Sequence, residues 1–143
     1  MKKVILFTAV FVPAVVSSFV LVSNHNVSIV KENIWSIGIY EGSSPVHFFD
    51  PSSIVNPVLE ASDVTDVKAS FVADPFLYRY NDTWYLFFEV MNETSKHGDI
   101  GLAVSKDGKS WVYDQIVLNE EYHLSYPYVF QHDSVIYMIP ESA

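Results

Sequence analysis

Two carboxylates stand where strand pairing would bring them together. Asp74 comes just before a predicted strand, and Glu89 ends the strand that returns from the next turn. Because neighbouring strands lie about 4.8 Å apart, antiparallel pairing would place Glu89 beside Asp74. Carboxyl groups that close can share a proton with one pKa raised, as acid–base chemistry requires. A structural interpretation stays open, in which Asp74 caps the turn before Pro75 and Glu89 accepts hydrogen bonds at a strand end.

A second group of polar and aromatic residues gathers at the start of a later strand. It contains His123, Tyr126 and Tyr128, and Glu141 ends the following strand as Glu89 does. Exposed tyrosine and histidine side chains suit stacking on a sugar ring and hydrogen bonding to its hydroxyl groups. Tyrosines in a sheet core would look the same in sequence, and Glu141 could equally accept hydrogen bonds at a strand end. These four are the candidate substrate-binding residues.

No metal or cofactor site is expected. The chain has no cysteine, which excludes thiol catalysis, disulfides and cysteine-ligated metals. The other histidines show no ligand spacing with one another; they are His25, His47, His97 and His132. Asp63 and Asp66 form a lone Asp-x-x-Asp, which is more often a solvated turn than a calcium site.

The charge balance argues against nucleic acid as a partner. Apart from Lys2 and Lys3, six basic residues face 17 acidic ones, a net charge of −11. Such a surface repels a phosphate backbone. Aromatic residues make up 15% of the 143 residues, which is typical of β-sheet proteins and of sugar-binding surfaces.

The sequence of residues 1–23 indicates export or membrane anchoring. Lys2 and Lys3 precede an apolar stretch over residues 4–22, which resembles a secretory signal and approaches the roughly 20 residues that span a bilayer. We favour an uncleaved signal-anchor over a cleaved signal peptide. A buried core helix is the third alternative and is favoured least. Residues 24–34 would then be a linker. The remainder would lie outside the cytoplasm, in the Golgi or ER lumen of a eukaryote, in the periplasm or outside a bacterium, or secreted after cleavage.

Three sequons could carry glycans in a eukaryotic secretory pathway. They begin at Asn26, Asn81 and Asn92. A glycan needs a surface position, so each is a glycosylation candidate only where the fold exposes it.

The rest of the chain predicts strands, and the pattern repeats. Short β-branched and aromatic runs are divided by turn residues; the predicted strands cover 35–40, 76–80, 83–89, 100–105 and 111–118. Residues 73–89 superpose on 125–141 at a constant offset of 52 without a gap, with Pro75 on Pro127 and Glu89 on Glu141. A four-strand unit that recurs at about 50 residues is the signature of a β-propeller blade. Two unrelated hairpins of similar composition are the alternative.

The expected fold is therefore all-β, a partial propeller after an N-terminal hydrophobic helix. Residues 71–118 would form one complete blade, the next unit would supply half a blade, and residues 35–40 would be a closing strand. Because a blade cannot bury its faces alone, residues 35–143 are expected to be the N-terminal part of a larger propeller domain, cut short. A degraded, inactive product is a further alternative.

Several motifs occur in a recognisable order. They are Trp35-Ser36-Ile37-Gly38-Ile39-Tyr40, Asp63-Val64-Thr65-Asp66-Val67, Val72-Ala73-Asp74-Pro75-Phe76, Trp84-Tyr85-Leu86-Phe87-Phe88-Glu89, Gly98-Asp99-Ile100-Gly101-Leu102-Ala103, His123-Leu124-Ser125-Tyr126-Pro127-Tyr128-Val129-Phe130 and Met138-Ile139-Pro140-Glu141-Ser142. Together they resemble the N-terminal domain of glucosamine inositolphosphorylceramide transferase and its bacterial relatives. The resemblance implies a five-bladed propeller, similar to arabinanases, fructosidases and related glycoside hydrolases. It also implies that longer relatives add the missing blades and a glycosyltransferase domain.

The resemblance assigns roles to particular residues. In the related hydrolases an Asp at the position of Asp74 is the general base, and inversion needs an acid about 6.5 to 9.5 Å away. Tyr126 stands at the matching position of the second unit, where those hydrolases usually have an auxiliary carboxylate. Residues 105–111 look like the Ser-x-Asp-Gly-x-x-Trp hairpin of sugar-acting propellers, and their role is expected to be structural.

The expected function is carbohydrate recognition by a membrane-tethered domain of a glycosyltransferase-like protein, without a complete catalytic site in this chain. The partners would be a carbohydrate or glycolipid sugar headgroup, and the membrane through residues 4–22. The alternative is a glycoside hydrolase of the five-bladed type with Asp74 as general base and its acid outside this sequence. Asp74 and Glu89 are the candidate catalytic residues, and no cofactor is expected.

Overall fold

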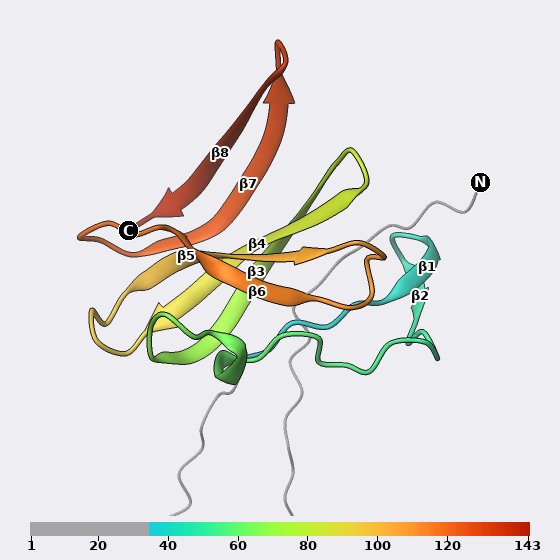
Figure 1. Cartoon of the computed structure of the whole chain (residues 1–143), viewed down its shortest axis with the longest axis horizontal. Helices are drawn as coiled ribbons and strands as arrows, with labels where there is room; N and C mark the ends of the chain where they lie inside the picture. Colours follow the sequence, from blue (N-terminus) through green and yellow to red (C-terminus); the bar gives the residue numbers. More distant parts are fainter. Residues whose placement is uncertain (1–34) are drawn as a thin grey trace, which may run out of the picture.

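The computed structural model describes residues 35–143, and this part of the chain is built from β-strands (Figure 1). The strands are β1 (Glu41–Ser44), β2 (His47–Phe49), β3 (Ala69–Tyr80), β4 (Thr83–Asn92), β5 (Gly98–Ser105), β6 (Val112–Leu118), β7 (Leu124–His132) and β8 (Val135–Ser142). One turn of 3-10 helix, η1 (Ala61–Asp63), is the only helical element between residues 35 and 143. The predicted all-β class is confirmed.

The predicted N-terminal helix falls outside the described residues, as do the signal-anchor at 1–23 and the linker at 24–34. Within residues 35–143, no helix has the length and apolar character needed to cross a bilayer.

The central sheet is an antiparallel meander in the order β3-β4-β5-β6. Leu86, Phe88 and Val90 alternate along β4 and are completely buried. The turns form where the sequence predicts them: Asn81 adopts a φ of 52° between β3 and β4, and Gly108 a φ of 72° between β5 and β6. The complete four-strand unit expected over residues 71–118 is therefore present.

The segment before β1 lies on this sheet rather than in it. The strand predicted at residues 35–40 makes only one isolated bridge, between Ile37 and Leu59. The Ile37 N–H donates to the Leu59 carbonyl at 2.9 Å, and the Val58 N–H donates to the Ile37 carbonyl at 2.8 Å. Ile37 and Leu59 belong to the same buried cluster as Leu86 and Phe88. The apolar pattern thus reflects burial against a sheet face, and the regular strand predicted over residues 35–40 is wrong. Its role in closing a ring stays a prediction.

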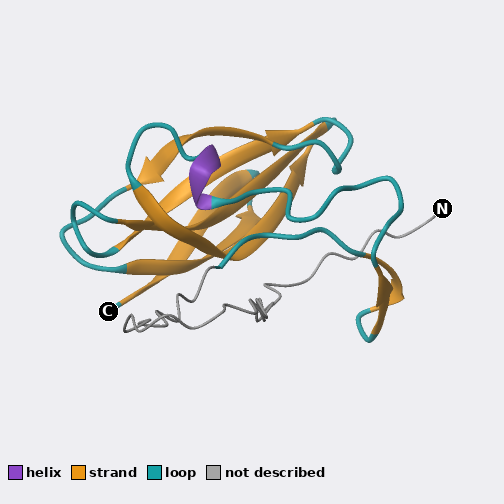
Figure 2. Ribbon diagram, turned by 90° about the horizontal axis from the view of Figure 1, so that it is seen from below, coloured by secondary structure: helices purple, strands orange, loops and turns teal. Residues whose placement is uncertain are grey.

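A small hairpin, β1–β2, was not predicted from the sequence. It pairs Glu41 with Phe49 and projects from the body of the domain (Figure 2). Val46 in its turn and both Phe48 and Phe49 in β2 are exposed, so the hairpin lacks the half-buried alternation by which strands are recognised in a sequence.

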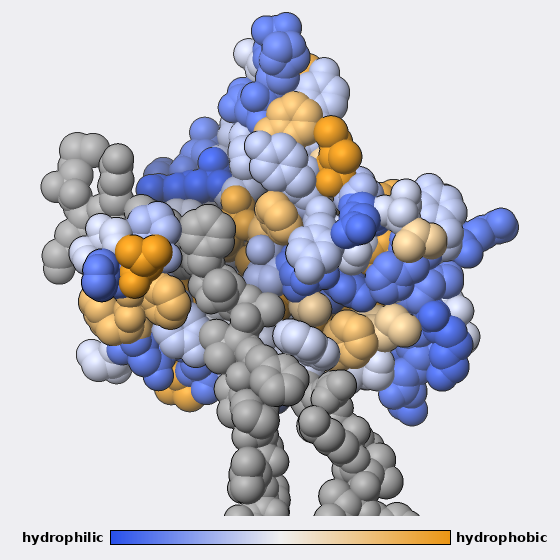
Figure 3. All heavy atoms as spheres, turned by 180° about the vertical axis from the view of Figure 1, so that it is seen from behind, coloured by the Kyte–Doolittle hydropathy of each residue, from blue (hydrophilic) through white to orange (hydrophobic). Residues whose placement is uncertain are grey.

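The β7–β8 hairpin forms a separate two-stranded sheet beside β3 (Figure 1). Several of its apolar side chains lie on the surface (Figure 3); they are Val135, Ile136 and Ile139. Its pairing copies that of β3–β4 at the offset of 52. Ser125 pairs with Glu141 as Ala73 pairs with Glu89, and both first strands then shift register before pairing resumes. The sequence repeat is therefore also a repeat of backbone geometry, although the sheets of the described residues do not close into a ring.

Candidate functional site

Two matching β-bulges build the candidate site. The bulged residues, Asp74 in β3 and Tyr126 in β7, have φ values of 49° and 44°. This left-handed region is unfavourable for a residue other than glycine, and such strain is concentrated at functional sites. A bulge re-aims its side chain, and here the Tyr126 hydroxyl forms a hydrogen bond with the Asp74 carboxylate. Equivalent residues of the two units thus meet each other.

Asp74 and Glu89 form a carboxyl pair. Glu89 lies across the strand ladder from Ala73, its side chain is 7% exposed, and it forms a hydrogen bond with Asp74. Burial, followed by this hydrogen bond and the charge on Asp74, raises the pKa of Glu89 to about 8. The prediction that strand pairing brings the two carboxyl groups together is confirmed. The raised pKa keeps a proton on Glu89 at neutral pH.

His123 completes this cluster from the loop before β7. Its Nε2 lies 3.4 Å from Glu89 Oε1, and its Nδ1 accepts a hydrogen bond from the Gly98 N–H at 2.9 Å. Because Nδ1 is the acceptor, the proton of the neutral ring is on Nε2, facing Glu89. The structure therefore brings Asp74, Glu89, His123 and Tyr126 into one connected group.

Gly98 belongs to the site although the sequence did not point to it. A Cβ at this position would lie 2.3 Å from the Leu124 carbonyl oxygen and 3.0 Å from both Glu89 Oε1 and His123 Cε1. Glycine in a strand often marks a close approach of this kind, and that signal could have found it.

Tyr128 and Glu141 flank the cluster. The side chain of Tyr128 is 55% exposed; its ring packs edge-on against Phe76 at 6.0 Å and stacks on Phe130 at 5.5 Å. Glu141 is exposed at the end of β8. The charge on Asp74, followed by partial burial and the charge on Glu141, raises the pKa of Tyr126. The site thus presents aromatic rings beside negatively charged acceptors.

The sequons differ in exposure. Asn81 is exposed in the β3–β4 turn, whereas Asn92 is 6% exposed. The Asn92 side-chain nitrogen, to which a glycan would be attached, donates to Asp99 Oδ2 at 2.9 Å, and its Oδ1 accepts from the Thr94 N–H at 2.8 Å. A glycan on Asn92 is incompatible with these contacts, and Asn26 lies outside the described residues.

Asp63 and Asp66, the Asp-x-x-Asp pair, have structural partners. Asp63 Oδ2 accepts the Glu60 N–H at 2.8 Å, and Asp66 accepts the Tyr113 hydroxyl and the Ile116 N–H. Between residues 35 and 143 no group of three or more histidine and acidic side chains could hold a metal ion.

The turn at residues 105–111 has a structural role, as expected. The Asp107 carboxylate accepts hydrogen bonds from the N–H groups of Lys109 and Ser110, both at 2.8 Å. These bonds hold the pKa of Asp107 well below its usual range. Trp111, at the end of the turn, packs against the buried cluster.

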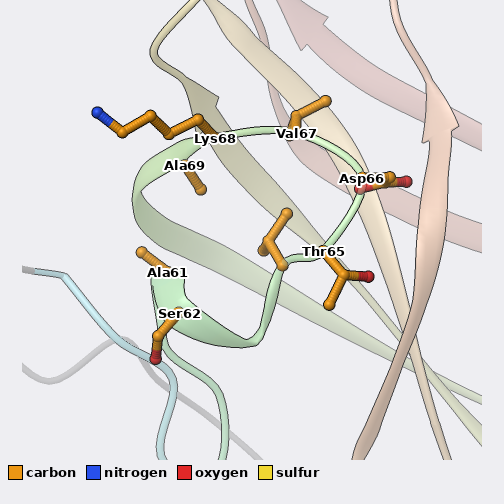
Figure 4. Close-up of a pocket in the computed structure, with 8 residues that line it drawn as sticks. Ala61, Ser62, Thr65, Asp66, Val67, Lys68 and Ala69 are labelled. Carbon is orange, nitrogen blue, oxygen red and sulfur yellow. The ribbon is translucent and has the colours of Figure 1, made fainter.

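An open depression of about 660 Å³ lies between η1 and the start of β3 (Figure 4). Residues 61, 62 and 64–69 line it, among them Asp66, which is already bonded to Tyr113 and Ile116. It contains none of the predicted site residues, so the bulge-centred cluster remains the candidate site.

Comparison with known proteins identifies the family. The family model for "Glucosamine inositolphosphorylceramide transferase 1, N-terminal" matches residues 28–143. The chain belongs to this family. It is 40% identical to glucosamine inositolphosphorylceramide transferase 1 of Oryza sativa subsp. indica and subsp. japonica over 144 aligned residues, which are 89% of this chain and 19% of each relative. The Arabidopsis thaliana protein of the same name is 40% identical over 127 residues, 78% of this chain and 17% of that protein.

Membership of the family confirms the main resemblance inferred from the sequence motifs. The chain spans about a fifth of the length of these curated relatives. No solved structure matches the chain significantly. The similarity to propeller hydrolases and to bacterial relatives therefore stays a prediction, as do the functional roles of the site residues.

Proposed function

We propose that this domain binds the sugar headgroup of a carbohydrate or glycolipid, as a membrane-tethered accessory part of a glycosyltransferase-type protein. One observation carries the proposal: Tyr126 and Tyr128 are 52% and 55% exposed beside the hydrogen-bonded carboxyl pair of Asp74 and Glu89. A sugar ring offers an apolar face for the aromatic rings and hydroxyl donors for the carboxylate. The tether would be residues 4–22, and the domain would lie outside the cytoplasm.

The charge of the site favours particular sugars. Asp74 and Glu141 both place negative charge close to Tyr126. Carboxylates accept hydrogen bonds from hydroxyl and ammonium groups, whereas a ligand carboxylate would be repelled. Neutral or amino sugars should therefore bind better than uronic acids of the same ring shape.

The alternative function, glycoside hydrolysis with Asp74 as general base, is less well supported by the geometry. Retaining hydrolases hold two carboxyl groups about 5 to 5.5 Å apart, and inverting ones about 6.5 to 9.5 Å. Asp74 and Glu89 are in direct hydrogen-bonding contact, which is too close for them to flank a glycosidic bond. Hydrolysis would therefore need an acid from another part of the protein.

The propeller interpretation is also part of the proposal. Asp74 meets Tyr126, and Phe76 meets Tyr128; each pair joins positions that are 52 apart in the repeat. Contact between equivalent residues of neighbouring units is expected when blades are arranged around an axis with β3 and β7 innermost. This supports a partial five-bladed propeller with the candidate site near its axis, and further blades supplied in longer relatives.

Saturation-transfer NMR on the full chain in a mild detergent tests sugar binding. Methyl glucoside and glucosamine should receive saturation, and glucuronic acid should receive markedly less. Tyr126→Ala and Tyr128→Ala should each reduce the signal several-fold. Tyr80→Ala is the matched control, because Tyr80 is 47% exposed at the far end of β3. An equal loss with Tyr80→Ala, or no transfer to any of the three sugars, would reject the assignment.

A further inference from the structure

The backbone amide at the start of β5 directs the hydrogen bonds of the candidate site. We propose that Gly98 is a positioning residue: its N–H holds the neutral His123 ring as the Nε2–H tautomer and thereby directs the ring N–H toward Glu89. The inference concerns the same site as the proposed function, but it can be tested without any ligand.

The contacts of His123 define its tautomer. Gly98 N lies 2.9 Å from Nδ1, and a backbone N–H can only donate. Nδ1 must therefore carry the lone pair, since a proton there would set two donors against each other. The neutral ring then has its proton on Nε2, which faces Glu89 Oε1 at 3.4 Å. The ring N–H is therefore directed toward the Glu89 carboxyl group.

The contacts continue from Glu89 to Asp74. Glu89 forms a hydrogen bond with Asp74, and Asp74 also forms a hydrogen bond with the Tyr126 hydroxyl. The orientation of the His123 ring, which the Gly98 amide sets, is therefore connected through Glu89 to the exposed part of the site.

Gly98 is held in place by its neighbour Asp99. Asp99 is completely buried; its Oδ2 accepts the Asn92 amide at 2.9 Å, and its Oδ1 accepts the Asn119 amide at 2.7 Å. The Asn92 N–H in turn donates to the His97 carbonyl at 3.1 Å. These bonds tie the end of β4 and the residue after β6 to the start of β5, and so fix the peptide that precedes Gly98.

The absence of a side chain at Gly98 is equally necessary. The 2.3 Å separation between an added Cβ and the Leu124 carbonyl oxygen involves backbone on both sides, so it cannot be relieved by a rotamer change. The same Cβ would press on the His123 ring and on Glu89 Oε1, both at 3.0 Å. Alanine at this position should therefore separate the amide from Nδ1.

The test is NMR of the ¹⁵N-labelled full chain in detergent micelles at neutral pH. His123→Gln identifies the His123 ring signals by their loss. In the unsubstituted chain, His123 Nδ1 should resonate as an unprotonated ring nitrogen, Nε2 as an N–H, and a ¹⁵N–¹⁵N coupling across the hydrogen bond should join Gly98 N to Nδ1. A protonated Nδ1, or no coupling to Gly98, would overturn the proposal.

Two variants separate positioning from general structure. Gly98→Ala should abolish the coupling and shift the ring signals. Gly38→Ala is the control, because its Cβ would meet only side-chain atoms, at 3.2 Å from Tyr40 and 3.3 Å from Asn56, and it should retain the coupling. If Gly98→Ala fails to fold, the measurement on the unsubstituted chain still decides. If the unsubstituted chain shows the coupling but binds none of the sugars, the proposed function is rejected and this inference stands.

Discussion

Replacement of Glu89 by Gln should remove a pH dependence of stability. Burial, followed by the hydrogen bond with Asp74 and its charge, raises the pKa of Glu89 from its ordinary value of 4.5 to about 8. Between these values the folded chain holds a proton that the unfolded chain lacks. The contribution of Glu89 to the free energy of unfolding is therefore fully present below pH 4.5 and is lost as pH rises through about 8.

The size of this effect follows from the two pKa values. Each pH unit between them corresponds to about 1.4 kcal/mol. Since the side chain is 7% exposed, solvent screening does not reduce this figure greatly. From pH 6 to pH 8 the free energy of unfolding should fall by about 2 kcal/mol through Glu89 alone. Glutamine has the shape of protonated glutamate: its amide nitrogen can donate to Asp74 and its oxygen can accept from His123. The variant keeps these bonds without titrating.

The assay is urea unfolding of the full chain in mild detergent at pH 6 and pH 8, followed by tryptophan fluorescence. Glu89→Gln should gain about 2 kcal/mol relative to the unsubstituted chain between the two pH values. Titrating groups distant from Glu89 contribute equally to both chains and cancel in this difference. Glu121→Gln, which alters an exposed carboxyl group, should change nothing. Parallel pH dependence of Glu89→Gln and the unsubstituted chain would refute the raised pKa of Glu89.

Three further predictions concern other parts of the chain. Asp99→Ala should destabilise the domain by about 2 kcal/mol in urea unfolding, because the buried Asn92 amide loses its acceptor; Asp114→Ala, at an exposed site, is the control, and equal effects would contradict the buried tie. In a eukaryotic secretory host, Asn81→Gln should remove a glycan from the mass, whereas Asn92→Gln should leave it unchanged; a glycan at Asn92 would show that the β4–β5 turn is formed differently. The full chain should resist extraction from membranes by alkaline carbonate, and deletion of residues 4–22 should release it; easy extraction of the full chain would reject the tether.

Pairing between strands that are consecutive in the sequence was predictable. The Asn81 turn and the alternation along β4 fix the β3–β4 hairpin, and this is enough to place Glu89 beside Asp74. The repeat at 52 residues likewise predicted that β7–β8 copies β3–β4. Both inferences succeeded because a short turn leaves few registers between adjacent strands.

The structure of the segment before the central sheet was harder to predict from the sequence. Residues 35–40 have the composition of a strand, yet they lie against the face of the sheet with a single bridge at Ile37. An apolar run looks the same whether it is buried by edge pairing or by a layer above it. The β1–β2 hairpin escaped prediction for the opposite reason, because Phe48 and Phe49 are exposed rather than half-buried.

The sequence by itself determined the strands of the central sheet, their local pairing and the meeting of the two carboxyl groups, since these depend on residues joined by short turns. Only the tertiary structure decided that Tyr126 bonds to Asp74 and that His123 bonds to Gly98, 25 residues away. Those contacts arise where β7 packs beside β3 and β5, and side-chain periodicity within a strand carries no information about which other sheet will face it. The proton on Glu89 depends on the same packing, because burial is the main cause of its raised pKa.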